Sequence, residues 1–97
     1  MIPTARTTDT EQEQRTHRAI LPPYAVILHN DDDHDMDYVV EALRKSVSEL
    51  SEDEAFRIMM EAHRNGTAVV IVCPLEQAEL YRDRLRSFGL GATVEKA

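Results

Sequence analysis

Cysteine is nearly absent from this 97-residue sequence, and no stretch is long and apolar enough to cross a membrane. The single thiol, Cys73, cannot form an internal disulfide, which excludes a fold held together by disulfides within the chain. A membrane-spanning helix needs about 20 mostly apolar residues, and no charged and then apolar leader is present. We therefore expect a cytoplasmic protein in which Cys73 is a buried, unreactive thiol at the end of a strand.

Basic residues are scarce relative to acidic ones. The chain has 11 Lys and Arg against 18 Asp and Glu, which gives a net charge of -7. Binding to a nucleic-acid backbone or to an anionic membrane requires clustered basic side chains, so neither partner is expected. An acidic chain of this length fits one domain with a single core, expected as a monomer that meets a basic partner or a cationic group.

The N-terminal stretch differs in composition from the rest of the chain. Residues 1–20 are mostly polar and show almost no apolar periodicity, so they cannot bury enough surface to offset the entropy lost on ordering. Pro22 and Pro23 then favour extended chain and exclude a helix. The sequence therefore predicts a flexible N-terminal extension over residues 1–23 and one folded domain over residues 24–97.

The first half of that domain predicts one strand and two helices. The apolar run 24–28 is typical of a strand, and the apolar spacing that follows predicts an amphipathic helix over about 35–48. Ser51 and Glu54 match a capping box, which predicts the start of a second helix. Asn65 and Gly66 tolerate the left-handed conformation that ends a helix, so we expect this helix to stop there.

The second half predicts a strand, a helix and a short strand. The continuous β-branched run 67–73 indicates a mostly buried central strand. Pro74 is expected at the first position of a helix over 75–88, whose inward residues would be Ala78, Tyr81, Leu85 and Phe88. A short strand is expected at 92–95. The order β-α-α-β-α-β predicts an α+β fold in which a three-stranded sheet packs against three helices.

Polar chemistry concentrates in the turn between the first strand and the first helix. The segment 29–36 reads His-Asn-Asp-Asp-Asp-His-Asp-Met, which places four carboxylates, one amide and two imidazoles at one strand-to-helix turn. Such a turn is held at both ends, so its side chains can be directed at a ligand. The structural alternative is that Asp33 or Asp35 caps the helix and that the other acids form a solvated loop.

A second element supplies the partner for this turn. If the first strand lies beside the second helix, Asn30, Asp31 and His63 would come together as three acceptors for the three donors of an α-ammonium group. Apolar side chains beside them would line a hollow, namely Leu28, Met36, Val39, Met59 and Ala62. This arrangement indicates a receptor for a peptide N-terminus that begins with a bulky apolar residue. The alternative is that the methionines belong to the core and that His63 interacts with the helix dipole.

These residues resemble a known family, the ClpS adaptors of the bacterial N-end rule. The segment 24–32 with Met36 and Val39 is similar to the family's strand and Asn-Asp-Asp signature. Met59 and His63, followed by Gly66 and Ala68, resemble its Met-x-x-x-His helix end and the following Gly-x-Ala. The closing residues 93–97 are similar to its C-terminus. The resemblance covers residues 24–97 and rests on two separated motifs in register.

The resemblance implies an adaptor that presents N-degron substrates, whose first residue is Phe, Tyr, Trp or Leu, to a ClpA or ClpC unfoldase. Asn30, Asp31 and His63 would hold the α-amino group. The pocket for the first side chain would be formed or rimmed by Leu28, Asp32, His34, Met36, Val39, Met59, Ala62 and Leu90. Glu76 would contribute to docking on the N-terminal domain of the unfoldase, and the polar extension would engage its pore.

Two other kinds of function compete with this interpretation. A metal-dependent enzyme could use His29, His34 and the aspartates, but strand alternation directs His29 away from Leu28 and Asn30, and no helix offers a second ligand pair. We therefore expect no catalytic residue, no metal and no cofactor. The other alternative is a ClpS-like protein that binds the unfoldase and changes its substrate choice without reading N-termini.

Overall fold

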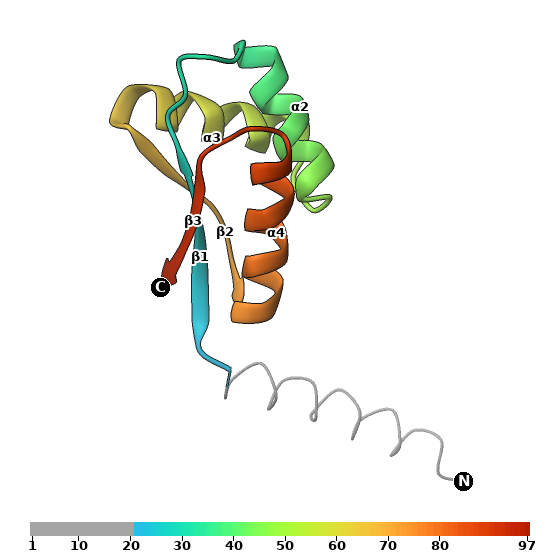
Figure 1. Ribbon diagram of the computed structural model, residues 1–97, viewed down its shortest axis with the longest axis vertical. Helices are drawn as coiled ribbons and strands as arrows, with labels where there is room; N and C mark the ends of the chain where they lie inside the picture. Colours follow the sequence, from blue (N-terminus) through green and yellow to red (C-terminus); the bar gives the residue numbers. More distant parts are fainter. Residues whose placement is uncertain (1–20) are drawn as a thin grey trace, which may run out of the picture.

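A computed structural model describes residues 21–97 (Figure 1). The elements in order are β1 (Pro23–His29), α2 (Met36–Ser46), α3 (Glu52–Asn65), β2 (Thr67–Pro74), α4 (Leu75–Ser87) and β3 (Ala92–Lys96). The predicted order and the α+β class are confirmed. Of the predicted extension 1–23, residues 1–20 lie outside the described part of the chain, and Pro23 is already the first residue of β1.

The three strands form an antiparallel sheet in the order β2-β1-β3 (Figure 1). The central strand is β1, so the prediction that the run 67–73 is central was wrong. Along β2 exposure alternates, with Ala68 and Val70 at 3% and 6% against 50% for Val69. A β-branched sequence suits a half-exposed edge strand as well as a central one, which is why composition alone did not distinguish them.

The helices pack on one face of the sheet and complete a single core. From β1 the buried side chains that point to the helices are Val26 and Leu28. These two side chains meet Leu43 of α2 and Val47, which directly follows that helix. They also meet Ala55, Met59 and Ala62 of α3 and Ala78, Tyr81 and Leu85 of α4. Phe88, also predicted to face inward, is partly buried against this core.

Local sequence signals explain both ends of α3. The capping box at Ser51 is present, since the Ser51 hydroxyl accepts from the Glu54 N–H at 3.1 Å and the Glu54 carboxylate accepts from the Ser51 N–H at 2.9 Å. Gly66 ends α3 with a φ of 93°, in the left-handed region that favours glycine.

The ends of two helices differ from prediction. The first helix is shorter than expected, because α2 ends at Ser46 and its cap, Val47, is extended. Pro74 is not the first helical residue but the cap before α4, with φ -61° and ψ 154°. The fixed φ of proline suits both the cap and the first helical position, and the extended ψ shows that Pro74 is the cap.

A polar network joins α4 to the connection between α2 and α3. The buried Tyr81 hydroxyl donates to the Glu49 carboxylate at 2.7 Å and accepts from the Gln77 amide at 2.8 Å. Burial and, second, the Glu49 carboxylate raise the pKa of Tyr81, and the hydrogen bond from Tyr81 lowers the pKa of Glu49.

Burial also raises the pKa of the half-buried Cys73 thiol, which disfavours its reactive thiolate.

None of the helices described between residues 21 and 97 has the length and apolar character to span a bilayer.

The two faces of β2 can be tested with neighbouring residues. Val70 is buried against the helices, whereas Val69 is half exposed. Val70→Thr should lower the free energy of unfolding by about 1 to 3 kcal/mol, because it buries a hydroxyl. Val69→Thr, the matched control, should change it by less than about 0.5 kcal/mol. Urea unfolding measures both, and equal losses would contradict an edge strand with one covered face.

Candidate functional site

The C-terminal end of β1 is fixed from both sides. The His29 N–H donates to the Gly91 carbonyl and the Asn30 N–H donates to the Gly66 carbonyl, each at 2.9 Å. The second bond places Asn30 beside the end of α3, where His63 lies in the last turn. Strand pairing therefore brings together two segments that are 33 residues apart in the sequence, Asn30 and His63.

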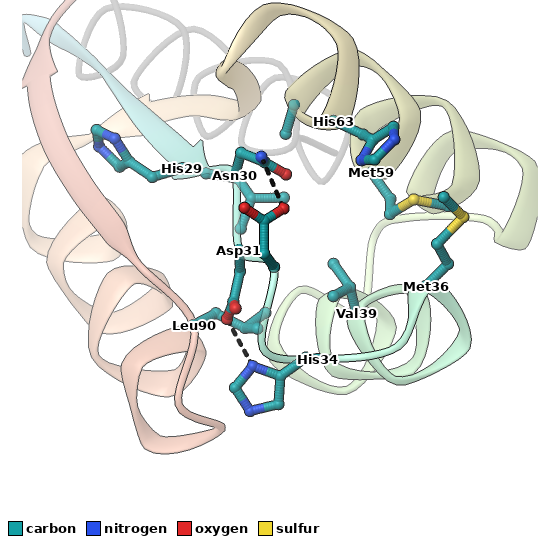
Figure 2. A pocket seen from close by; sticks show the side chains of 12 residues that line it. His29, Asn30, Asp31, His34, Met36, Val39, Met59, His63 and Leu90 are labelled. Carbon is teal, nitrogen blue, oxygen red and sulfur yellow. Dashed lines mark hydrogen bonds and ion pairs between the residues drawn. The ribbon is translucent and has the colours of Figure 1, made fainter.

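A pocket of about 160 Å³ opens at this junction (Figure 2). Its apolar wall consists of Leu28, Met36, Val39, Met59, Ala62 and Leu90, and its polar side consists of Asn30, Asp31, Asp32, His34 and His63, with His29 at the margin. The structure thus gathers around one cavity all the residues that were predicted for the amine site and for the side-chain pocket. Their roles in binding stay predictions.

The apolar wall combines buried and exposed side chains. Ala62, Leu90 and Met59 are only 2%, 3% and 4% exposed, so the base of the pocket is part of the core. Met36 is 46% exposed and lies beside Met59 at the mouth (Figure 2). A flexible thioether at the opening can adapt to the shape of an entering side chain.

Asp31 is bound within its own turn. One carboxylate oxygen accepts from the Asp33 N–H at 2.7 Å, and the other contacts His34 Nδ1 at 2.5 Å. The Asp33 N–H and then the His34 side chain lower the pKa of Asp31 below its usual value of 3.8. Figure 2 shows this carboxylate pointing to His34, away from Asn30 and His63.

Asp32 is the carboxylate that lies beside Asn30. The Asn30 Nδ2 donates to Asp32 Oδ1 at 3.4 Å. The sequence hypothesis grouped Asn30 and His63 with Asp31 as the amine acceptors and placed Asp32 at the pocket rim. In the structure Asp32 contacts Asn30 and Asp31 contacts His34, while both acids line the pocket, and which of them binds the amine stays a prediction.

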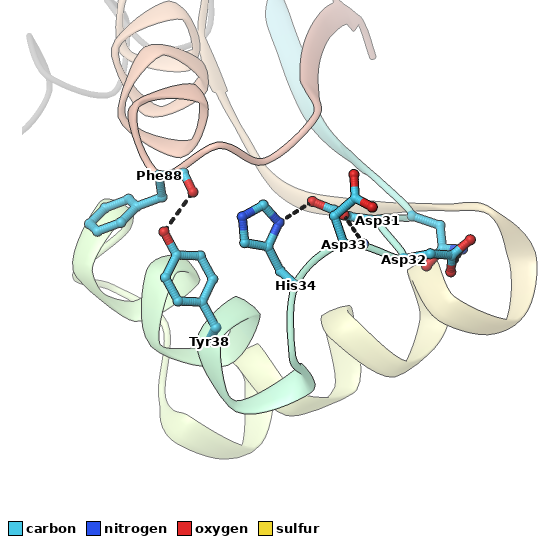
Figure 3. A network of polar contacts seen from close by, with 7 residues as sticks. Asp31, Asp32, Asp33, His34, Tyr38 and Phe88 are labelled. Carbon is cyan, nitrogen blue, oxygen red and sulfur yellow. Dashed lines mark hydrogen bonds and ion pairs between the residues drawn. The ribbon is translucent and has the colours of Figure 1, made fainter.

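His34 is held by a contact that the sequence did not predict. Its ring stacks on Tyr38 with centroids 4.8 Å apart and planes 14° apart (Figure 3). The Tyr38 hydroxyl donates to the Phe88 carbonyl at 2.7 Å, and a Cβ added at Gly89 would lie 3.3 Å from the His34 ring. This contact ties the turn to the connection between α4 and β3, and Tyr38 and Phe88 are too distant in sequence for periodicity to pair them.

One residue at the margin turns its side chain away from the pocket, and the predicted docking residue lies elsewhere. The His29 imidazole points away, as strand alternation predicted, with Nε2 at 2.8 Å from Thr93 Oγ1 (Figure 2). Glu76 lies in the first turn of α4, exposed, within a separate groove. That groove is lined by Leu21, Pro22, Tyr24, Pro74, Leu75, Gln77, Glu79, Leu80 and Asp83 in addition.

Comparison with known proteins agrees with the geometry. Residues 20–93 match the family model of the ATP-dependent Clp protease adaptor protein ClpS. The chain belongs to the ClpS family. The resemblance stated from the two motifs is thereby confirmed, and the family is one of protease adaptors.

Relatives of this ClpS family member share much of its length. It is 49% identical over 83 residues to the ATP-dependent Clp protease adapter protein ClpS of Synechococcus elongatus. The matched region covers 86% of this chain and 87% of that protein. It is 46% identical over 87 residues to the chloroplastic CLPS1 of Arabidopsis thaliana, covering 90% of this chain and 55% of that protein.

A solved structure is similar in fold as well. The structure of Agrobacterium tumefaciens ClpS2 bound to L-phenylalaninamide superposes with a TM-score of 0.73 at 35% identity. The match covers 78% of this chain and 98% of that chain. The three-stranded sheet with three helices is therefore the architecture of a solved family member.

The lowered pKa of Asp31 predicts how this residue contributes to acid stability. A carboxylate with a depressed pKa stabilises the fold above its usual value of 3.8, and this contribution is lost as the pH falls through the lower value of the folded state. Asp31→Asn should therefore be less stable than the wild type near neutral pH, and the gap should close below about pH 3.8.

Urea unfolding from about pH 6 to about pH 2.5 measures this gap across the acid range. Asp33→Asn is the control, since only the backbone N–H of Asp33 contacts Asp31. A gap for Asp31→Asn that persists undiminished in strong acid would show that the carboxylate charge is not its source.

Proposed function

We propose that this protein binds the free N-terminus of substrates that begin with Phe, Tyr, Trp or Leu and delivers them to a ClpA/ClpC-type unfoldase. The observation that carries the proposal is the junction of amine acceptors and an apolar cavity in one pocket. Family membership supports the adaptor role. On this proposal the protein is a cytoplasmic, non-catalytic adaptor that needs no cofactor.

The ligand of the Agrobacterium relative supports the substrate class. L-phenylalaninamide combines a free α-amino group, an aromatic side chain and an uncharged carboxamide in place of a carboxylate. It therefore has the same groups as the first residue of a peptide that starts with Phe. The cavity in our protein suits such a ring, because an apolar cavity of roughly 150 Å³ is large enough to bind benzene.

The acceptor geometry favours Asp32 over Asp31 for direct contact with the ammonium group. Both oxygens of Asp31 already have partners in the turn, whereas Asp32 has its carboxylate beside Asn30. Since Asn30 donates its Nδ2 to Asp32, its Oδ1 stays available as an acceptor. A ring nitrogen of His63 is the proposed third acceptor, which would give one acceptor for each ammonium proton.

Delivery requires a second surface, and we propose that Glu76 contributes to it. Glu76 lies at the start of α4 beside Leu75 and Leu80, which are 41% and 47% exposed. Glu79 and Asp83 line the same groove, so this surface is both acidic and apolar. Such a surface suits a partner that offers basic and apolar side chains, here the N-terminal domain of the unfoldase.

Acetylating the ligand tests recognition of the N-terminus. A peptide that begins with Phe should bind, and its Nα-acetylated form should bind at least about a hundredfold more weakly, because the acceptors would be desolvated without charge or donors to match them. Fluorescence anisotropy with a dye at the distant end of the peptide measures both affinities. Equal affinities would support the alternative in which the protein modulates the unfoldase without reading N-termini.

Neighbouring aspartates test which carboxylate contacts the amine. Asp32→Asn should weaken binding of the free-amine peptide by about tenfold or more, because it removes a charged acceptor beside Asn30. Asp33→Asn removes the same charge one residue away, outside the pocket lining, and should bind nearly as the wild type. Equal effects of the two substitutions would indicate general charge attraction rather than a specific contact.

A further inference from the structure

Three methionines lie between residues 21 and 97, and their environments differ. Met36, the first residue of α2, is 46% exposed, whereas Met59 in α3 is only 4% exposed. Met60 is partly buried against the core. Of the three, Met36 therefore offers the largest surface to a reagent dissolved in water.

Met36 belongs to the pocket wall but not to the hydrophobic core. Its side chain lines the pocket together with Met59, and Figure 2 shows the two thioethers turned toward each other. The core and the side chains packed against it include Met59 and Met60 but not Met36. A chemical change at Met36 should therefore alter the pocket while the fold stays intact.

The reaction open to an exposed thioether is oxygen transfer from a peroxide. The sulfur lone pair attacks one oxygen of hydrogen peroxide, the O–O bond breaks, and the other oxygen leaves as water. Sulfur loses two electrons and becomes a sulfoxide, and the peroxide is reduced. A methionine sulfoxide reductase reverses the change with two thiols, which become a disulfide as the oxygen leaves in water.

A sulfoxide at Met36 would place a strong hydrogen-bond acceptor in the apolar wall. If its oxygen faces the pocket, the oxygen loses its water when an apolar side chain enters, and that side chain has no donor to offer. If the oxygen faces solvent, it keeps its water at the mouth and reduces the apolar surface that the entering side chain can cover. Both orientations oppose binding of a bulky apolar side chain.

We propose that Met36 is an oxidation site at the mouth of the pocket, where a peroxide converts the thioether to a sulfoxide and thereby weakens binding of apolar N-termini. The effect on binding rests on the proposed function, whereas the order in which the methionines are oxidised does not. Because reductases restore the thioether, the modification is reversible. Substrate capture then falls in the presence of peroxide and recovers on repair.

Peptide mapping by mass spectrometry tests the site itself. The full chain is treated with hydrogen peroxide at increasing concentrations, and the sulfoxide fraction of each methionine is measured after digestion. Met36 should be oxidised at lower concentrations than Met59 and Met60, and urea unfolding of protein oxidised to this level should match that of untreated protein. Equal oxidation of the three methionines, or a loss of stability on oxidation of Met36, would overturn the inference.

Fluorescence anisotropy tests the consequence for binding, with a peptide that begins with Phe and contains no sulfur. The wild type should bind about tenfold more weakly after peroxide, and treatment with sulfoxide reductases and dithiothreitol should restore its affinity. Each variant is compared with its own untreated form. Met36→Leu should keep its affinity through the same treatment, whereas Met60→Leu, the matched control outside the pocket lining, should lose as much as the wild type.

Both leucine variants retain Met59 and Cys73, so any damage at these residues is common to them. Met36→Gln tests the same idea without peroxide, because it places a polar group of similar length in the wall, and it should bind about tenfold more weakly than Met36→Leu. An equal peroxide loss in Met36→Leu and the wild type, or equal affinities of the Gln and Leu variants, would overturn the inference. Failure of the untreated wild type to bind the peptide would overturn the proposed function, whereas peptide mapping would still decide whether Met36 is oxidised first.

Discussion

The site depends on the fixed position of the end of β1. This strand pairs on both sides, and its last residues also donate to Gly66 and Gly91, which follow α3 and precede β3. The turn that begins at Asn30 is therefore anchored to both neighbouring connections. Because each bond comes from backbone N–H groups, this anchoring does not use the side chains of the turn.

Hydrogen bonds inside the turn give its acidic residues different partners. Asp31 accepts from the Asp33 N–H and from His34, which makes it part of the scaffold. Asp32 instead accepts from the Asn30 side chain, and on the proposed function this carboxylate would contact the ammonium group. The acidic residues of the turn thus differ in their partners, since Asp31 is bonded within the turn and Asp32 is bonded to Asn30.

The chemistry of the pocket matches what an adaptor in a proteolytic pathway must recognise. An internal peptide segment has no free α-amino group, so acceptors that require an ammonium group select chain ends. On the proposed function, the apolar wall, with Ala62 and Leu90 as its buried base, would select among chain ends by the shape of the first side chain. On the proposed function, recognition and delivery would use different elements, because Glu76 and the exposed leucines of α4 lie in a separate groove.

The sequence by itself determined the element order, the helix boundaries at Ser51 and Gly66, and the set of residues around the pocket. The order and the boundaries follow from local rules, namely capping and periodicity, and the set of pocket residues follows in part from the resemblance of two motifs to a known family. The tertiary structure alone decided that β1 rather than β2 is central, that Asp32 rather than Asp31 faces Asn30, and that Tyr38 holds His34. Each of these depends on pairing between distant segments or on which hydrogen bonds a turn can complete, and neither is encoded in the residue types at those positions.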